Sequence, residues 1–167
     1  SPDVLELKLL PASRLEVENI QALYGSKATL RVGPEATEEN AKAMRSDTSI
    51  IHFACHGLIN ERFPLESALA LTIPEVEGLE EGSEDGLLHA WEVFERVRLD
   101  ADLVVLSACE TGLGTEAGGE GLIGLTRAFQ YAGARSILAS LWEVSDISTA
   151  AFMKLFYGNL KAGMTKD

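Results

Sequence analysis

The stretch LVVLSACETG at residues 103–112 decides the fold. It starts as an uninterrupted apolar run and then changes to small residues, a cysteine and a glycine. A second stretch, IIHFACHG at residues 50–57, has the same design, with a histidine near its end. Continuous apolar runs are typical of parallel strands that are covered on both faces. Each stretch is therefore predicted to be a buried strand that ends in a reactive side chain, Cys109 in one and His56 in the other.

Helices and strands alternate along the rest of the chain. Ser13 with Glu16 forms a capping box for a first helix, and Thr37 is the expected cap of a second. Apolar spacing predicts further helices at residues 87–97, 122–131 and 146–157, and short strands at residues 28–32, 68–73 and 136–142. The alternation predicts an α/β fold, a three-layer sandwich with a mostly parallel central sheet.

The reactive residues are expected at one edge of this sheet. In open parallel sheets, sites lie beyond the carboxyl ends of the strands. His56, Cys109 and the segment at residues 143–146 all follow predicted strands at that edge. Right-handed crossovers favour adjacency of at least two of these segments.

Composition narrows the classes of function. The 167 residues fit one domain, and 46% apolar residues suffice for a core. The net charge of -12 argues against a nucleic-acid partner and favours a basic one. The sequence has no leader pattern and no apolar run near the ~18 residues of a membrane span, so no membrane association is expected. The two cysteines, Cys55 and Cys109, are predicted to be free thiols in a reducing compartment, the cytoplasm.

An acidic stretch, EVEGLEEGSED at residues 75–85, has six carboxylates, two glycines and no basic residue. It is predicted to be a solvated loop outside the core. The alternative is that it attracts a basic partner or substrate.

His56 and Cys109 are the candidate catalytic pair. A peptidase cysteine reacts as a thiolate, and an imidazole can share its proton and later protonate the leaving amine. The two residues lie 53 positions apart, so only the fold can bring them together. Gly57 permits a substrate carbonyl to approach its backbone N–H, which with the N–H of Cys109 predicts an oxyanion hole.

Other interpretations compete with this one. A cysteine in an apolar strand is usually an inert core residue, and Cys55 is interpreted in that way. His52 is interpreted as a buried, hydrogen-bonded histidine, and His89 lies on a predicted helix without an evident partner. No metal site is expected, because no C-x-x-C pair is present and strand alternation sends Cys55 and His56 to opposite sides.

The glycine-rich segment GLGTEAGG at residues 112–119 superficially resembles a phosphate loop. Its spacing fits neither known glycine fingerprint, and Glu116 and Glu120 would repel phosphate. No nucleotide or other cofactor is expected. The glycines are better explained as flexibility beside the nucleophile in a segment that rearranges on activation.

The sequence resembles the CHAT domain, the caspase-related module found with tetratricopeptide repeats. The resemblance extends over nearly the whole chain from about Leu10, and its motifs are HFACHG at residues 52–57, LVVLSACETG, GEGLIGLTRAFQYAGA at residues 119–134 and SLWEVSDISTAAFMKLFY at residues 140–157. It implies a caspase-like fold. It also implies that residues 1–167 are a single domain, as a fragment that lacks upstream segments of the family.

The resemblance implies a cysteine endopeptidase of the caspase, gingipain and separase clan. Carried over to this chain, the clan's histidine-glycine pair is His56 with Gly57, and its nucleophile is Cys109. The expected partners are a protein or peptide substrate and a tetratricopeptide repeat region or another activating protein. The alternative is a scaffold or interaction module that keeps the fold and is inactive alone or awaits activation by a partner.

A preference for a basic P1 residue is implied by the arginine-preferring members of the clan. Their acidic pocket residue follows the strand after the cysteine, a role that LWEVSD assigns to Asp146 first and Glu143 second. A carboxylate there would pair with a guanidinium. Asp146 is interpreted equally well as the cap of the last helix, and Trp142 as either a pocket wall or a core residue.

Overall fold

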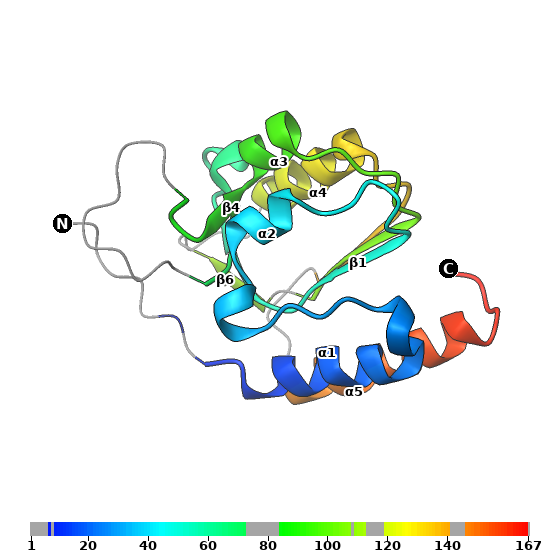
Figure 1. The fold of residues 1–167 in the computed structure, drawn as a ribbon. Helices are drawn as coiled ribbons and strands as arrows, with labels where there is room; N and C mark the ends of the chain where they lie inside the picture. The colour runs from blue at the N-terminus through cyan, green and yellow to red at the C-terminus, as the bar shows by residue number, and fades with distance from the viewer. Residues whose placement is uncertain are drawn as a thin grey trace.

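The structure, a computed structural model, describes residues 7, 9–72, 84–107, 109–112, 119–140 and 146–166. For residues 109–112 and 146 it describes the backbone and not the side chains. The α/β fold class is confirmed: helices lie above and below the central strands in Figure 1. No helix among the described residues is long and apolar enough to cross a membrane.

Three strands form a parallel sheet. In spatial order they are β1 (Ile50–Phe53), β5 (Leu103–Leu106) and β7 (Ile137–Ala139). The central strand β5 alternates between two apolar clusters: Val104 and Leu106 belong to one, and Leu103 and Val105 to the other. Its continuous apolar run is therefore explained by cover on both faces, as predicted.

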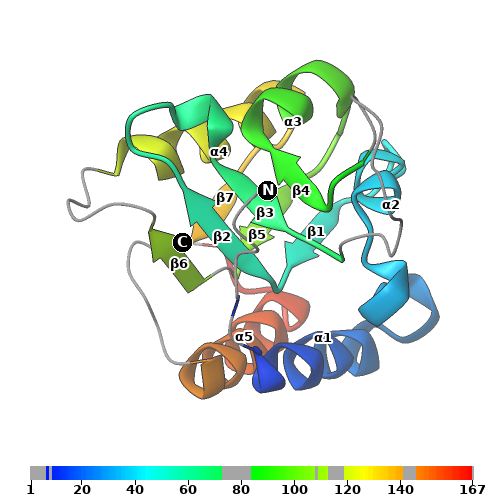
Figure 2. The same ribbon diagram turned by 90° about the vertical axis from the view of Figure 1, so that its left-hand side faces the viewer.

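Four strands form a second, mixed sheet. Figure 2 shows them side by side in the order β4 (Leu87–His89), β3 (Ala68–Ala70), β2 (His56–Ile59) and β6 (Cys109–Gly112). β2 and β3 are antiparallel, whereas β2 and β6 are parallel. The strand predicted at residues 68–73 is present as β3, which also pairs with β4 on its other side.

Along the chain, β2 follows β1 and β6 follows β5. Ile50 pairs with Leu103 in the first sheet and His56 pairs with Cys109 in the second, so the same offset of 53 residues holds in both sheets. The prediction that each strand ends at its reactive residue therefore needs correction. His56 and Cys109 each begin a further strand, in which the two segments pair in the same register.

Two helical layers complete the sandwich. On one face α1 (Pro11–Tyr24) and α5 (Asp146–Lys161) lie side by side, and on the other are α3 (Ala90–Arg96) and α4 (Glu120–Ala132) (Figure 1). Met153 and Tyr157 of α5 pack against β5 on the first face. Val93 of α3 and Phe129 of α4 belong to the larger apolar cluster on the second.

The short α2 (Glu38–Lys42) begins as predicted, since the Asn40 N–H donates to Thr37 Oγ1 at 3.2 Å. The predicted strand at residues 28–32 is wrong. These residues pair with no described strand and lie between two 3-10 turns, η1 (Gly25–Lys27) and η2 (Gly33–Glu35). A third 3-10 turn is η3 (Pro64–Glu66).

Two helix starts also differ from prediction. The capping box is wrong: α1 begins at Pro11, Ser13 Oγ donates to the Leu10 carbonyl, and Glu16 is buried. The helix predicted at residues 87–97 begins only at Ala90, because the first three residues pair with β3 as β4. Phe94 on this helix is exposed.

Candidate functional site

His56 and Cys109 are register partners on the neighbouring parallel strands β2 and β6. Neighbouring strands lie about 4.8 Å apart, so the fold brings the two backbone positions to the same level of one sheet. His56 is buried, with 9% of its surface exposed. Gly57 follows on β2 and pairs with Glu110. The sequence-predicted residues His56, Gly57 and Cys109 are thus collected in one short piece of ladder.

Sequence analysis missed a polar residue that lies two positions before Cys109. Ser107 is buried, and its N–H donates to the Phe53 carbonyl at 2.9 Å, which continues the pairing of β5 with β1. Its Oγ has no hydrogen-bond partner among the residues that the structure describes. The sequence signal for this residue was a serine directly after the apolar run LVVL.

The predicted substrate-binding residues are placed only in part. β7 lies beside β5, so the chain leaves the sheet next to the strand that leads to Cys109. Asp146 is the first residue of α5, and its side chain lies outside the described part of the structure. Trp142 and Glu143 lie outside the described residues altogether.

His52 is a structural histidine, as predicted. Its Nε2 lies 2.7 Å from Glu16 Oε1 on α1, and its Nδ1 lies 2.9 Å from Tyr157 Oη on α5. Burial raises the pKa of Tyr157, so the phenol stays protonated and can donate to the imidazole. Glu16 and Tyr157 are almost fully buried. The group therefore joins both helices of one layer to β1.

The remaining histidine and the described thiol have no catalytic arrangement. His89 Nδ1 lies 3.0 Å from the carbonyl of Glu66, and the His89 N–H donates to Glu92 Oε2 at the start of α3. Burial raises the pKa of Cys55 to about 12, so this cysteine stays a thiol at neutral pH. It is free of any disulfide, as predicted.

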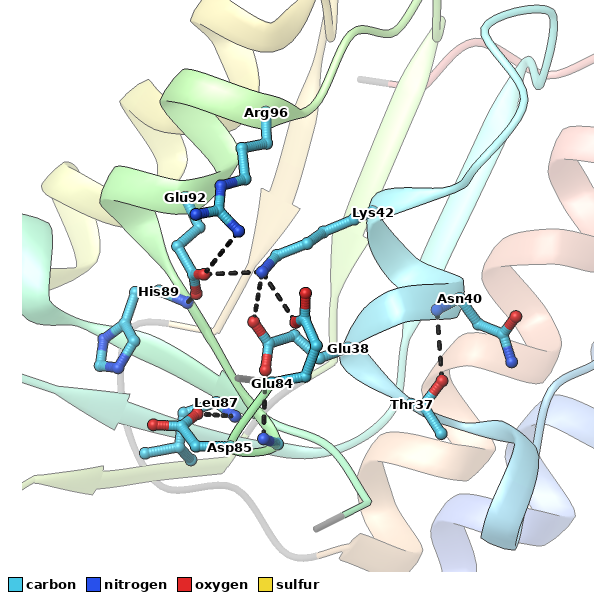
Figure 3. A network of polar contacts seen from close by, with 11 residues as sticks. Thr37, Glu38, Asn40, Lys42, Glu84, Asp85, Leu87, His89, Glu92 and Arg96 are labelled. Carbon is cyan, nitrogen blue, oxygen red and sulfur yellow. Dashed lines mark hydrogen bonds and ion pairs between the residues drawn. The ribbon is translucent and has the colours of Figure 1, made fainter. Parts of the chain in front are cut away.

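A buried ionic group, the Lys42 cluster, comprises Lys42, Glu38, Glu84 and Glu92 (Figure 3). The Lys42 Nζ lies 2.5, 2.8 and 2.6 Å from oxygens of Glu38, Glu84 and Glu92, respectively. These carboxylate oxygens lie within 4.8 Å of one another, and the ammonium among them supplies a compensating positive charge. Arg96 approaches Glu92 at 3.9 Å.

The pKa values in the Lys42 cluster follow from burial and mutual contact. Burial, and then a hydrogen bond with Glu84, raises the pKa of Glu38 to about 7. The same hydrogen bond lowers the pKa of Glu84. Burial opposes the charge on Lys42, but its three carboxylate partners outweigh burial and raise the pKa of this lysine.

The Lys42 cluster also changes the interpretation of the acidic stretch. Glu84 was predicted to lie in a solvated loop, whereas its carboxylate is bound by Lys42 and only 36% of its side chain is exposed. Asp85 is exposed, as predicted, and accepts from the Leu87 N–H. Residues 75–83 lie outside the described part of the chain.

Comparison with known proteins agrees with the motif-based resemblance. The CHAT domain family matches residues 3–167. Among individual proteins, the chain is 28% identical to mouse tetratricopeptide repeat protein 28 and 27% identical to its human counterpart, in each case over 93% of this chain. The chain spans only 7% of the length of each relative. With its α/β architecture and a family match over almost its full length, the chain belongs to the CHAT domain family, which is related to the caspase-like peptidases.

Proposed function

We propose that this CHAT domain is a cysteine endopeptidase of the caspase and separase type, with His56 and Cys109 as its catalytic dyad. The observation that carries the proposal is the register of β2 and β6, in which these two residues are direct partners. Residues in register on neighbouring strands share a face of the pleat. A nucleophile and its base must lie within hydrogen-bond reach, and this backbone placement permits that distance.

The proposed reaction has two stages. The Cys109 thiol gives its proton to His56, and its sulfur forms a bond to the substrate carbonyl carbon, whose oxygen becomes an oxyanion. Backbone N–H groups of Gly57 and Cys109 are the proposed donors to this oxyanion. Collapse breaks the C–N bond, and the amine leaves with the proton from His56. Water then attacks the thioester, His56 accepts its proton, and the acid product and free thiol are released.

We further propose that the enzyme prefers a basic P1 residue. The net charge of -12 favours the approach of cationic segments. Asp146, and after it Glu143, are the proposed partners of the P1 side chain, and Trp142 is a proposed wall of the pocket. Cleavage that is equally fast after arginine and after alanine would remove this part of the proposal.

The alternative proposal is an interaction module that acts with a tetratricopeptide repeat region. The two relatives are tetratricopeptide repeat proteins. The outer faces of α1 and α5 expose Leu15, Phe152 and Leu155, each by more than half of its surface. Large exposed apolar side chains on neighbouring helices are common where another protein binds.

Peptide cleavage tests the primary proposal. Fluorogenic peptides with arginine, lysine, aspartate or alanine at P1 are compared for the wild-type chain, Cys109→Ala and His56→Ala, with Cys55→Ala as the matched control. The proposal requires that the two dyad variants lose activity and that Cys55→Ala keeps it. An arginyl electrophile should label Cys109, and iodoacetamide should compete with this labelling. Neither cleavage nor labelling, with or without a tetratricopeptide repeat protein added, would favour the interaction module.

A further inference from the structure

Glu61 joins the end of the His56 strand to the chain that returns from the Cys109 strand. It lies two positions after β2 ends at Ile59. We propose that Glu61 is a positioning residue that keeps Cys109 in register with His56, an inference that rests on the proposed peptidase function.

The carboxylate of Glu61 binds the start of α4 with both of its oxygens. The Gly119 N–H donates to Oε1 at 3.2 Å, and the Glu120 N–H donates to Oε2 at 2.9 Å. The first N–H groups of a helix have no partner within the helix, and its N-terminus has a partial positive charge. A carboxylate from a distant part of the chain therefore caps α4 with charge-assisted hydrogen bonds.

The turn that bears Glu61 is itself fixed. Asn60 Oδ1 accepts from the N–H groups of Arg62 and Phe63, at 3.1 and 2.9 Å, which closes a side-chain turn around Glu61. The Asn60 N–H donates to Oγ of Ser67 at 3.0 Å, and Ser67 is fully buried. The carboxylate is thus presented from a backbone that has little freedom to shift.

The first turns of α4 also pack closely against the same end of β2. A Cβ added at Gly121 would lie 2.6 Å from Ile59 Cγ2 and 2.8 Å from the Asn60 carbonyl oxygen. A Cβ added at Gly124 would lie 2.6 Å from Pro64 atoms. These glycines permit close contacts of α4 with the end of β2 and with η3 that a side chain would prevent. Glu61 therefore strengthens the contact between α4 and the end of β2, which close packing also stabilises.

The chain that follows the proposed nucleophile is attached to the end of β2 at two points. After Cys109, β6 ends at Gly112, which is the register partner of Ile59. The chain is next described at Gly119, whose N–H binds Glu61. Both ends of the intervening residues, 113–118, are therefore attached to the end of β2, the strand that begins with His56. Loss of the Glu61 carboxylate would weaken the second attachment, so that Cys109 would be held less firmly in register with His56.

The test combines two measurements on Glu61→Ala, Glu61→Gln and Gly121→Ala, with Glu66→Ala as the matched control. Glu66 is an exposed glutamate in the same connection between β2 and β3, so it controls for the loss of one negative charge. The first measurement is the hydrogen exchange of the Gly119 and Glu120 amides by NMR. The second is the rate of Cys109 alkylation by iodoacetamide against pH, with mass spectrometry separating Cys109 from Cys55.

In Glu61→Ala, exchange of the two amides should become at least about tenfold faster, because a charge-assisted acceptor is lost. The pH midpoint of Cys109 alkylation should move toward that of an ordinary thiol, about 8.5. Glu61→Gln, which keeps one acceptor oxygen, should restore part of the wild-type profile. Gly121→Ala should move the midpoint in the same direction as Glu61→Ala, and Glu66→Ala should change neither measurement.

Two results would overturn the positioning role: unchanged amide exchange in Glu61→Ala, or faster exchange with an unchanged Cys109 profile. Failure of the proposed function has a different signature. In that case the wild-type Cys109 itself titrates as an ordinary thiol and no peptide is cleaved, whatever the amides of Gly119 and Glu120 do.

Discussion

Two histidines, His52 on β1 and His56 on β2, have different surroundings, although they lie only four positions apart. His52 on β1 has a carboxylate at one ring nitrogen and a phenol at the other. His56 on β2 is the register partner of a cysteine. The first imidazole is fixed between the helices α1 and α5, and the second lies where two parallel strands pair. The comparison indicates that burial alone does not distinguish the two histidines, whereas the chemistry of their partners does.

The largest predicted effect concerns the chemistry of the second histidine. Cys109→Ala should lower kcat/KM for a basic peptide by at least about 10³-fold, and His56→Ala by about 10²–10⁴-fold. His52→Phe should change kcat/KM far less, once measured on the folded fraction. Steady-state kinetics with active-site titration measure these differences. Equal losses for His52→Phe and His56→Ala would erase the proposed distinction between the two histidines.

The second prediction concerns stability, for which His52 should matter more than His56. His52→Ala leaves the Glu16 carboxylate buried without its imidazole partner, and should lower the free energy of unfolding by about 4 kcal/mol. His56→Ala should cost less, because the loss at His52 includes the uncompensated Glu16 carboxylate. Urea denaturation followed by circular dichroism measures both values. The double variant Glu16→Gln with His52→Ala should recover part of the loss, since the buried charge is then removed.

Sequence patterns predicted the elements whose signal is local. The apolar runs identified the paired strands, and Thr37 identified the start of α2. They also placed His56 and Cys109 at equivalent points of similar motifs. The continuation of both strands beyond these residues was missed, because Gly57 and Gly112 looked like terminators.

Contacts between distant segments were not predictable in the same way. The Lys42 cluster draws on α2, the segment before β4 and α3, and no spacing in the sequence relates Lys42 to Glu84 or Glu92. The contact of Glu61 with Gly119 spans 58 positions and depends on the docking of α4. The role of Asp146 in substrate binding stays a prediction.

The third prediction extends the comparison to a buried carboxylate that has another carboxylate as neighbour. The pKa of Glu38 is raised to about 7 from its usual value of 4.5, so the folded state binds a proton there more tightly than the unfolded state. The resulting stability is fully present below pH 4.5 and is lost as the pH rises through about 7. The expected loss from this group is about 3 kcal/mol.

Glu38→Gln isolates that contribution, because the amide is similar in shape and does not titrate. Urea midpoints at pH 5 and pH 8 should fall more steeply with pH for the wild-type chain than for Glu38→Gln. The lowered pKa of Glu84 acts in the opposite direction and depends first on its hydrogen bond with Glu38. The amide of Glu38→Gln can replace that donor, so the contribution of Glu84 largely cancels in the difference. Parallel pH profiles for the two chains would show that Glu38 has no raised pKa in the fold.

The smallest predicted effect separates two buried serines. Ser67 Oγ accepts a hydrogen bond from the Asn60 N–H, whereas Ser107 Oγ has no partner among the described residues. Removing a hydroxyl that leaves a buried donor unsatisfied costs about 1–3 kcal/mol, whereas removing an unpaired hydroxyl is neutral or stabilising. Ser67→Ala should therefore lower the free energy of unfolding, and Ser107→Ala should leave it unchanged or raise it by up to about 1 kcal/mol. A loss at Ser107 as large as that at Ser67 would mean that the hydroxyl has a structural partner. If Ser107→Ala instead keeps its stability but lowers kcat/KM, the Ser107 hydroxyl acts on the substrate or on the dyad, and Ser107 joins His56 and Cys109 among the residues that affect the reaction.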